Sequence, residues 1–132
     1  MTQRPLPPVI GATENTLGAL LAQTLRTSTI PSPRAWVYLN LAVGGAPASV
    51  IEATLQLDTD EIAELEKDLI AQGLLHAPRV LSAQGTAGLD TARALVSDAT
   101  RSLTDGVSEE HEEIARQVLD TIRTNALKLL AR

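Results

Sequence analysis

The chain has 132 residues, of which 44% are hydrophobic and only 2% aromatic, and its formal net charge is −5. This length predicts a single domain, or one completed by a partner, with a helical core of Leu, Val, Ile and Ala. The acidic balance lowers the expectation of nucleic-acid binding, because Lys and Arg supply much of the affinity for phosphates. The absence of cysteine excludes disulfides, thiol catalysis and cysteine-ligated zinc. Because no apolar run has the length of a signal peptide or membrane helix, we expect a soluble cytoplasmic protein without a membrane partner.

The first segment, residues 1–12, is rich in proline and is predicted to be an extended arm rather than a helix. It is either a loose tail or an arm that packs across a partner subunit. In the second case its apolar anchors are Leu6, Val9 and Ile10. Thr13 is then expected to cap a first helix that runs to about Thr27.

Two shorter helices follow a break at residues 30–33. Ser32 is expected to cap the first of them with Pro33 at its first position, and this helix ends at Gly44-Gly45. A short helix from Ala48 through Leu55 comes next, and a tight turn joins it to the following helix. Two helices joined in this way form a helix-turn-helix arrangement.

Residues 57–75 have the pattern of an amphipathic helix with a defined start and end. Asp58 is expected to cap it, with Glu61 completing a capping box, and Gly73 is placed at its end. Its apolar stripe consists of Ile62, Leu65, Leu69 and Ile70. The opposite face has one base, Lys67. The acidic residues assigned to that face are Asp58, Asp60, Glu61, Glu64, Glu66 and Asp68.

Two short apolar segments around Ala77-Pro78 predict a small hairpin or a simple crossover, which would be a short wing carrying His76 and Arg79. Ser82 is expected to cap a long helix whose apolar residues follow a heptad spacing, up to a break at Asp105-Gly106. These residues are Leu89, Ala92, Val96, Ala99 and Leu103.

Ser108 is expected to cap a last helix that runs close to Arg132, with acidic residues at its start and basic residues toward its end, as the helix dipole favours. This helix and the preceding one each have a narrow apolar seam, and so small a chain has too little surface of its own to cover both seams. We therefore predict a homodimer built largely from these helices and the first one. The predicted interface residues are Leu89, Val96, Leu103, Ile114, Val118 and Ile122.

From about residue 13 to 128, the chain resembles the MarR (multiple antibiotic resistance regulator) family of winged helix-turn-helix regulators. Residues 35–39, AWVYL, are similar to the family pattern Q-W-x-V-L, and residues 58–74 align without a gap to S-x-x-T-V-x-R-L-V-x-x-L-E-x-x-G-L. Residues 81–89 resemble L-T-x-x-G-x-x-L-L, residues 106–110 resemble G-L-S-x-E-E, and residues 122–127 resemble the closing L-x-x-N-L.

The resemblance implies an all-α, winged-helix-like fold of six helices with a vestigial β-hairpin wing. The chain would be one MarR-like domain, with dimerisation helices in residues 13–30 and 82–132 and a helix-turn-helix lobe in residues 33–81. It also implies a two-fold dimer, DNA-binding lobes and often a small-molecule site, for which Trp36 and Tyr38 are candidate pocket residues. On the residues alone, Trp36 is predicted to be a core residue.

The departures from the family pattern fall on the parts that would contact DNA. Asp58 and Glu61 replace Ser and Thr near the start of the recognition helix, Glu64 replaces Arg, and residues 76–80 are too few for the charged wing. The surface formed by Asp58, Asp60, Glu61, Glu64 and Asp68 would therefore serve a protein partner, or it is simply a solvated helix face. Double-stranded DNA is a doubtful ligand for it.

No catalytic constellation is present in the sequence, so we expect no enzyme, no cofactor and no metal site. A metal site at His111 and the glutamates of residues 109–113 competes with the simpler interpretation of a solvated helix start. The hypothesis is a homodimeric MarR-like homologue with lost or weak DNA binding, which acts by binding a protein or a small ligand. The alternatives are a conventional DNA-binding MarR-type repressor and a structural dimer without a ligand.

Overall fold

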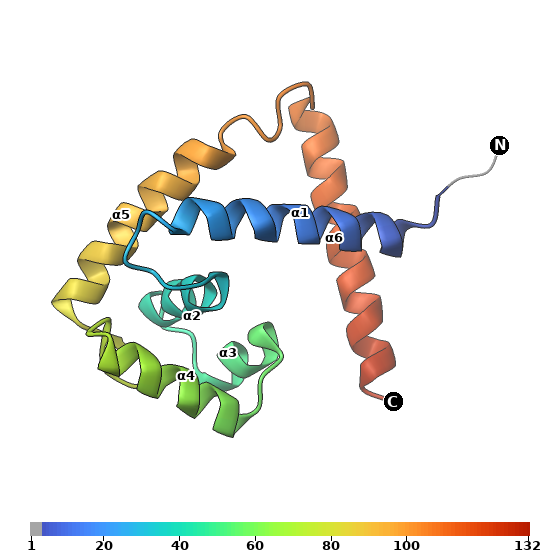
Figure 1. Cartoon of the computed structure of the whole chain (residues 1–132). Coiled ribbons are helices and arrows are strands. Elements are labelled where there is room, and N and C mark those ends of the chain that lie inside the picture. The colour runs from blue at the N-terminus through green and yellow to red at the C-terminus, as the bar shows by residue number, and fades with distance from the viewer. Residues whose placement is uncertain (1–3) are drawn as a thin grey trace. The chain divides into compact units, whose positions relative to one another are not determined.

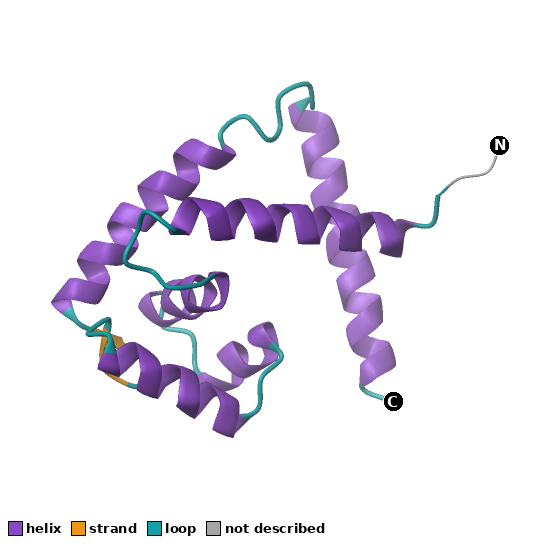
Figure 2. Cartoon of the chain, viewed as in Figure 1, coloured by secondary structure: helices purple, strands orange, loops and turns teal. Residues whose placement is uncertain are grey.

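A computed structural model describes residues 4–132 as six α-helices and one antiparallel two-stranded sheet (Figures 1 and 2). The mostly helical character with a small hairpin is therefore confirmed. Contacts divide the chain into two compact units, Met1–Ala99 and Thr100–Arg132, which are described separately. The elements are α1 (Leu6–Leu25), α2 (Pro33–Val43), α3 (Ala48–Leu55), α4 (Thr59–Ala71), β1 (Leu75–Ala77), β2 (Val80–Leu81), α5 (Ala83–Thr100) and α6 (Glu109–Leu130).

The helix α1 begins at Leu6, so the prediction of an extended arm is wrong for residues 6–12. Pro5 is the N-cap and prolines occupy the first turn, where an absent backbone N–H removes no intrahelical hydrogen bond. Thr13 is consequently an interior residue and not a cap, and its hydroxyl donates to the carbonyl of Val9 at 2.8 Å. Residues 1–3 of the predicted arm lie outside the described residues.

The predicted caps of α2, α4 and α6 are confirmed. Ser32 accepts a hydrogen bond from the backbone N–H of Ala35, and Ser108 accepts one from the N–H of His111. At α4, Asp58 Oδ1 accepts from the N–H of Glu61 at 2.8 Å, and Glu61 Oε1 accepts from the N–H of Asp58 at 3.2 Å. This capping box satisfies two donors that the first turn of a helix would otherwise leave without partners.

Replacing the cap of α4 tests how much this start contributes to stability. Asp58→Ala is expected to lower the free energy of unfolding by about 1 kcal/mol, because the N–H of Glu61 loses its acceptor. Asp58→Asn keeps an acceptor oxygen and is expected to restore most of that loss. Urea denaturation of both variants measures the effect, and equal losses for the two would contradict the assigned cap.

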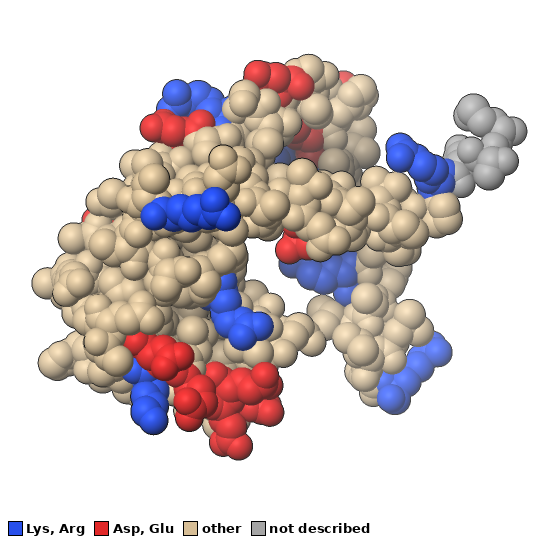
Figure 3. All heavy atoms as spheres, viewed as in Figure 1, with Lys and Arg blue, Asp and Glu red and all other residues tan. Residues whose placement is uncertain are grey.

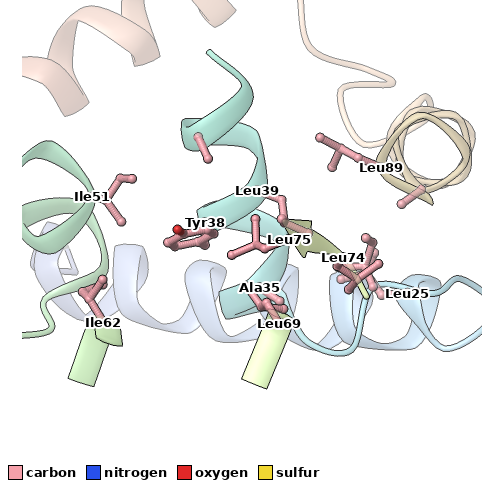
Figure 4. Close-up of a cluster of buried hydrophobic side chains, with 13 residues drawn as sticks. Leu25, Ala35, Tyr38, Leu39, Ile51, Ile62, Leu69, Leu74, Leu75 and Leu89 are labelled. Carbon is pink, nitrogen blue, oxygen red and sulfur yellow. The ribbon is translucent and has the colours of Figure 1, made fainter. Parts of the chain in front are cut away.

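The core of the first unit is built around α2, which lies between α1 and α4 (Figure 1) and contacts α1, α3 and β2. Its buried positions recur at helical spacing, so one stripe of the helix faces the core. Figure 4 shows how side chains from the neighbouring elements surround this stripe. The buried hydrophobic residues are Leu25, Ile30, Ala35, Tyr38, Leu39, Ala42, Ile51, Ile62, Leu69, Leu74, Leu75, Leu89 and Ala92.

The two strands pair in antiparallel orientation, so the segment is the predicted hairpin and not the alternative crossover. Leu75 pairs with Leu81 and Ala77 with Val80, so only Pro78 and Arg79 form the loop. Arg79 has φ 63°, the left-handed conformation that a tight turn requires at this position after a proline.

The start of α5 is fixed against the end of α4 by Ser82 and Gly85. Ser82 Oγ accepts from the N–H of Gly85 at 2.9 Å and donates to the carbonyl of Gly73 at 2.5 Å. A Cβ atom at Gly85 would lie only 1.9 Å from the carbonyl oxygen of Leu74. Glycine is therefore required by this close approach of two backbone segments.

The helix α5 ends at Thr100, earlier than the heptad pattern predicts. After it, the backbone forms turns in which an N–H bonds to the carbonyl three residues earlier. The N–H of Leu103 bonds to the carbonyl of Thr100, and the N–H of Asp105 bonds to that of Ser102. Short polar side chains in this segment compete with the helical backbone for hydrogen bonds. The predicted seam is therefore not continuous, because Leu103 lies in a turn beyond the helix.

Candidate interaction surface

A short turn connects α3 to α4 and brings a further carboxylate to the start of α4. Gln56 adopts the left-handed conformation with φ 55°, and the N–H of Leu57 bonds to the carbonyl of Glu52 at 3.1 Å. The hydroxyl of Thr59 donates to Glu52 Oε1 at 2.8 Å. Glu52 was not among the residues predicted from the sequence for this surface. The only available signal was Thr59 at the first position of α4, whose hydroxyl can donate a hydrogen bond to a side chain of α3.

Acidic side chains gather over α4 and the turn before it (Figure 3). Five of those that reach the surface are exposed, and the sixth, Glu52, is half-buried. We call this group the acidic α4 surface, and it consists of Glu52, Asp58, Asp60, Glu61, Glu64 and Asp68. Lys67 is the only base within α4. A surface of this composition favours cationic ligands and repels phosphates.

Glu52 of the acidic α4 surface accepts a hydrogen bond from Thr59, and the other five carboxylates fall into two kinds. Asp58 and Glu61 bond to backbone N–H groups, so the start of the helix offsets part of their charge. Asp60, Glu64 and Asp68 are four residues apart, and no hydrogen bond or ion pair within residues 4–132 involves their side chains. Like charges at this spacing destabilise a helix by about 0.2–0.5 kcal/mol a pair, so a cationic partner would relieve an existing repulsion.

The structure corrects the placement of Glu66, which the sequence assigned to the exposed acidic face. Its side chain is buried, 8% exposed, on the same stripe as Ile62 and Leu69. The hydroxyl of Tyr38 donates to Glu66 Oε2 at 2.5 Å and accepts from the N–H of Arg79 at 2.9 Å. The tyrosine thus connects α2, α4 and the hairpin, and it provides the partner that a buried carboxylate needs.

Burial raises the pKa of Tyr38 well above its ordinary value, and the hydrogen bond to Glu66 adds to this increase. The phenol therefore stays protonated and remains a donor at all ordinary pH values. Because its side chain is fully buried and its hydroxyl is bonded on both sides, Tyr38 does not line an open ligand pocket. The predicted role of Tyr38 in ligand binding is wrong for this conformation.

Trp36 is partly buried and packs against the core. Two surface hollows lie beside the end of α1 and the segment that follows it. One of them lies between α1 and α5 and is lined by Leu20, Gln23, Thr24, Thr27, Leu95, Asp98 and Ala99. Another is lined by Thr27, Ser28, Thr29, Gln84, Ala87, Gly88 and Thr91. Neither hollow contains Trp36, so its predicted part in a ligand pocket stays a prediction.

The predicted wing residues occupy the hairpin with both side chains exposed. His76 lies in the middle of β1, and Arg79 lies in the two-residue loop with its N–H held by Tyr38. The two-residue loop projects little beyond the strands. Arg79 is therefore the one cationic side chain that this hairpin presents.

The predicted dimer residues separate into two groups. Leu89 is buried in the core of its own chain, 1% exposed, so the prediction of a subunit contact is wrong for this side chain. Val96 is partly buried against the same core. The others lie in the second unit, where Leu103, Ile114 and Val118 are exposed and Ile122 is half-buried. Only this second group offers surface for a partner.

Comparisons with known proteins add no family to this description, because no family model, curated protein or solved structure matches the chain. Within residues 4–132, no helix is both long enough and apolar enough to cross a membrane. In the same residues, no group of three His, Asp or Glu side chains is arranged to hold a metal ion. The most distinctive surface in the described residues is the acidic one on α4.

Proposed function

We propose that this chain is a MarR-like winged-helix homologue that forms a homodimer and acts by binding a protein or small ligand, with lost or weak DNA binding. The order α2, α3, α4 and a short hairpin supports the winged-helix interpretation, in which α4 is the recognition helix. The observation that carries the proposal is the exposed stripe of Asp60, Glu64 and Asp68 on that helix. A cationic protein surface is the partner that this stripe favours.

Electrostatic magnitudes argue against duplex DNA as the ligand of α4. A carboxylate about 4 Å from a phosphate costs about 1 kcal/mol even at the dielectric constant of water. Several such contacts would remove much of the ~4–10 kcal/mol that separates specific from non-specific DNA binding. Arg79 and Lys67 are the nearby cations in the sequence, and they are too few to offset the acidic α4 surface.

The direct test is binding of the full chain to random-sequence duplex DNA at low salt, where non-specific binders are retained. We expect no measurable change in the anisotropy of a labelled duplex. The triple variant Asp60→Lys, Glu64→Lys, Asp68→Lys is expected to gain salt-dependent binding, because it presents a basic helix on the same scaffold. Binding by the unchanged chain would favour the conventional DNA-binding repressor.

A matched control separates the position of the charges from their number. Glu14→Lys, Asp90→Lys, Asp105→Lys alters exposed acidic residues outside α4 and gives the same formal net charge as the α4 triple variant. We expect the α4 variant to bind the duplex more tightly than this control. Equal affinity would show only a general effect of net charge, and it would contradict the assignment of α4 as a retained recognition helix.

The protein-binding role is tested by affinity capture from cell extract with two baits. Glu61→Lys with Glu64→Lys is expected to remove the basic proteins that the unchanged chain captures, because the charge at the contact is reversed. Mass spectrometry identifies the captured proteins. An identical set of proteins on both baits would count against the acidic α4 surface as the docking site.

A further inference from the structure

The helix α6 has an apolar face that its own unit leaves uncovered. It spans 22 residues from Glu109 to Leu130 and has no buried side chain. The α6 seam, defined as Ile114, Val118, Ile122 and Leu129, includes side chains that are 49%, 42% and 63% exposed at positions 114, 118 and 129. In proteins most of the stability of a helix comes from packing of its apolar face, so such a stripe normally packs against a partner.

Charges in the middle of α6 are paired within the helix. Arg116 Nε lies 3.1 Å from Glu113 Oε2, and it lowers the pKa of this carboxyl by hydrogen bonding. Arg123 forms a similar pair with Asp120, one turn earlier in the helix. The central part of α6 therefore has no charge that requires a partner from another molecule.

The two ends of α6 differ from its middle. Within residues 4–132, no hydrogen bond or ion pair involves the side chains of Glu109 and Glu110 at the start of the helix. The same holds for the side chains of Lys128 and Arg132 at its end. The free negative charges thus lie at one end of the helix and the free positive charges at the other. The ends are about 33 Å apart at the rise of 1.5 Å per residue, which is too far for them to interact in one helix.

We propose that α6 pairs in antiparallel orientation with α6 of a second copy of this chain. Antiparallel pairing places Glu109 and Glu110 of each copy beside Lys128 and Arg132 of the other, while the α6 seams cover one another. A parallel pair would instead bring like charges together at both ends, which destabilises the contact. This pairing rests on the dimer of the proposed function, and it specifies the partner and the orientation.

Single cysteines test the orientation without interference, because the chain has none of its own. In an antiparallel pair, residues near the middle of the helix face their own copies and residues at the ends face the opposite end. Thr121→Cys is therefore expected to form an intermolecular disulfide with itself. His111→Cys and Leu129→Cys are expected to cross-link efficiently only when mixed, with a larger tag on one copy to identify the product.

Two outcomes of the cross-linking would overturn the proposal. Efficient self-cross-linking at all three positions would show a parallel pair. No intermolecular product at any position, with a monomer in sedimentation velocity, would show that another part of the chain or another protein covers the α6 seam. Neither outcome changes the result expected for duplex binding by the full chain, so failure of the pairing is distinguishable from failure of the proposed docking role of α4.

Charge reversal gives a second, independent measurement. Glu109→Lys with Glu110→Lys, and Lys128→Glu with Arg132→Glu, are each expected to weaken self-association about tenfold, because several exposed ion pairs become repulsive. Mixing the two variants is expected to restore association as a heterodimer, and the gain should shrink in high salt. Failure of the mixture to associate better than either variant alone would contradict the antiparallel contact.

Discussion

Gly85→Ala is expected to destabilise the first unit by about 3 kcal/mol or more, the largest effect of any small substitution described for this chain. The added Cβ would lie 1.9 Å from the carbonyl oxygen and 2.8 Å from the carbonyl carbon of Leu74. Both are backbone atoms next to the hairpin, so no side-chain rotation can relieve the overlap. To accommodate the methyl group, α5 must move away from the hydrogen bonds of Ser82 that fix its start.

A series of the same substitution provides the controls. Gly88→Ala meets the hydroxyl of Thr29 at 2.3 Å, which is a side chain that can rotate, so a smaller loss is expected. Gly11→Ala in α1 meets nothing within 4 Å and is expected to stabilise the chain by about 0.5–1 kcal/mol, because alanine is the better helix former. Urea denaturation orders the three variants. A loss at Gly85 no greater than that at Gly88 would contradict the close approach of α5 to Leu74.

Tyr38→Phe is expected to lower the free energy of unfolding at neutral pH by about 2–4 kcal/mol. Its hydroxyl serves two groups, since it donates to Glu66 and accepts from the N–H of Arg79. Phenylalanine leaves a buried carboxylate and a backbone donor without their partners, and each loss is worth about 1–3 kcal/mol. Glu64→Gln, which changes an exposed carboxylate of the same helix, is the control and is expected to have little effect.

The same residue gives the stability of the fold a distinctive dependence on high pH. The pKa of Tyr38 is raised in the folded state, so the folded chain holds the phenol proton more tightly than the unfolded chain. This stabilisation is complete below the unfolded pKa of about 10, and it decreases above that pH by about 1.4 kcal/mol per pH unit. Tyr38→Phe lacks this contribution, so its stability should fall less steeply in alkaline solution.

Spectroscopy can follow this titration directly, because the chain contains a single tyrosine. Tyrosinate absorbance of the folded protein is expected to appear only as the protein unfolds in strong alkali. In urea, the same absorbance should rise at the ordinary pKa of tyrosine, about 10. A folded protein that titrates at this ordinary value would show that Tyr38 is accessible to solvent and would contradict its assigned hydrogen bonds.

The sequence by itself determined the features that depend on residues close together in the chain. The caps Ser32, Asp58 and Ser108 and the break at Gly44-Gly45 were all predictable, because each acts on backbone groups within a few residues. The start of α1 is also a local feature, and the prediction failed because prolines were treated as helix breakers. In the first turn they are tolerated, as α1 shows.

Only the tertiary structure decided which polar and apolar groups meet. Glu66 is buried because Tyr38, 28 residues earlier, supplies a donor, and Tyr38 in turn accepts from Arg79, 41 residues later. Leu89 lies in the core of its own chain, although its heptad spacing fits a partner helix equally well. Periodicity determines which face of a helix is apolar, but the burial of that face depends on the three-dimensional packing of distant segments.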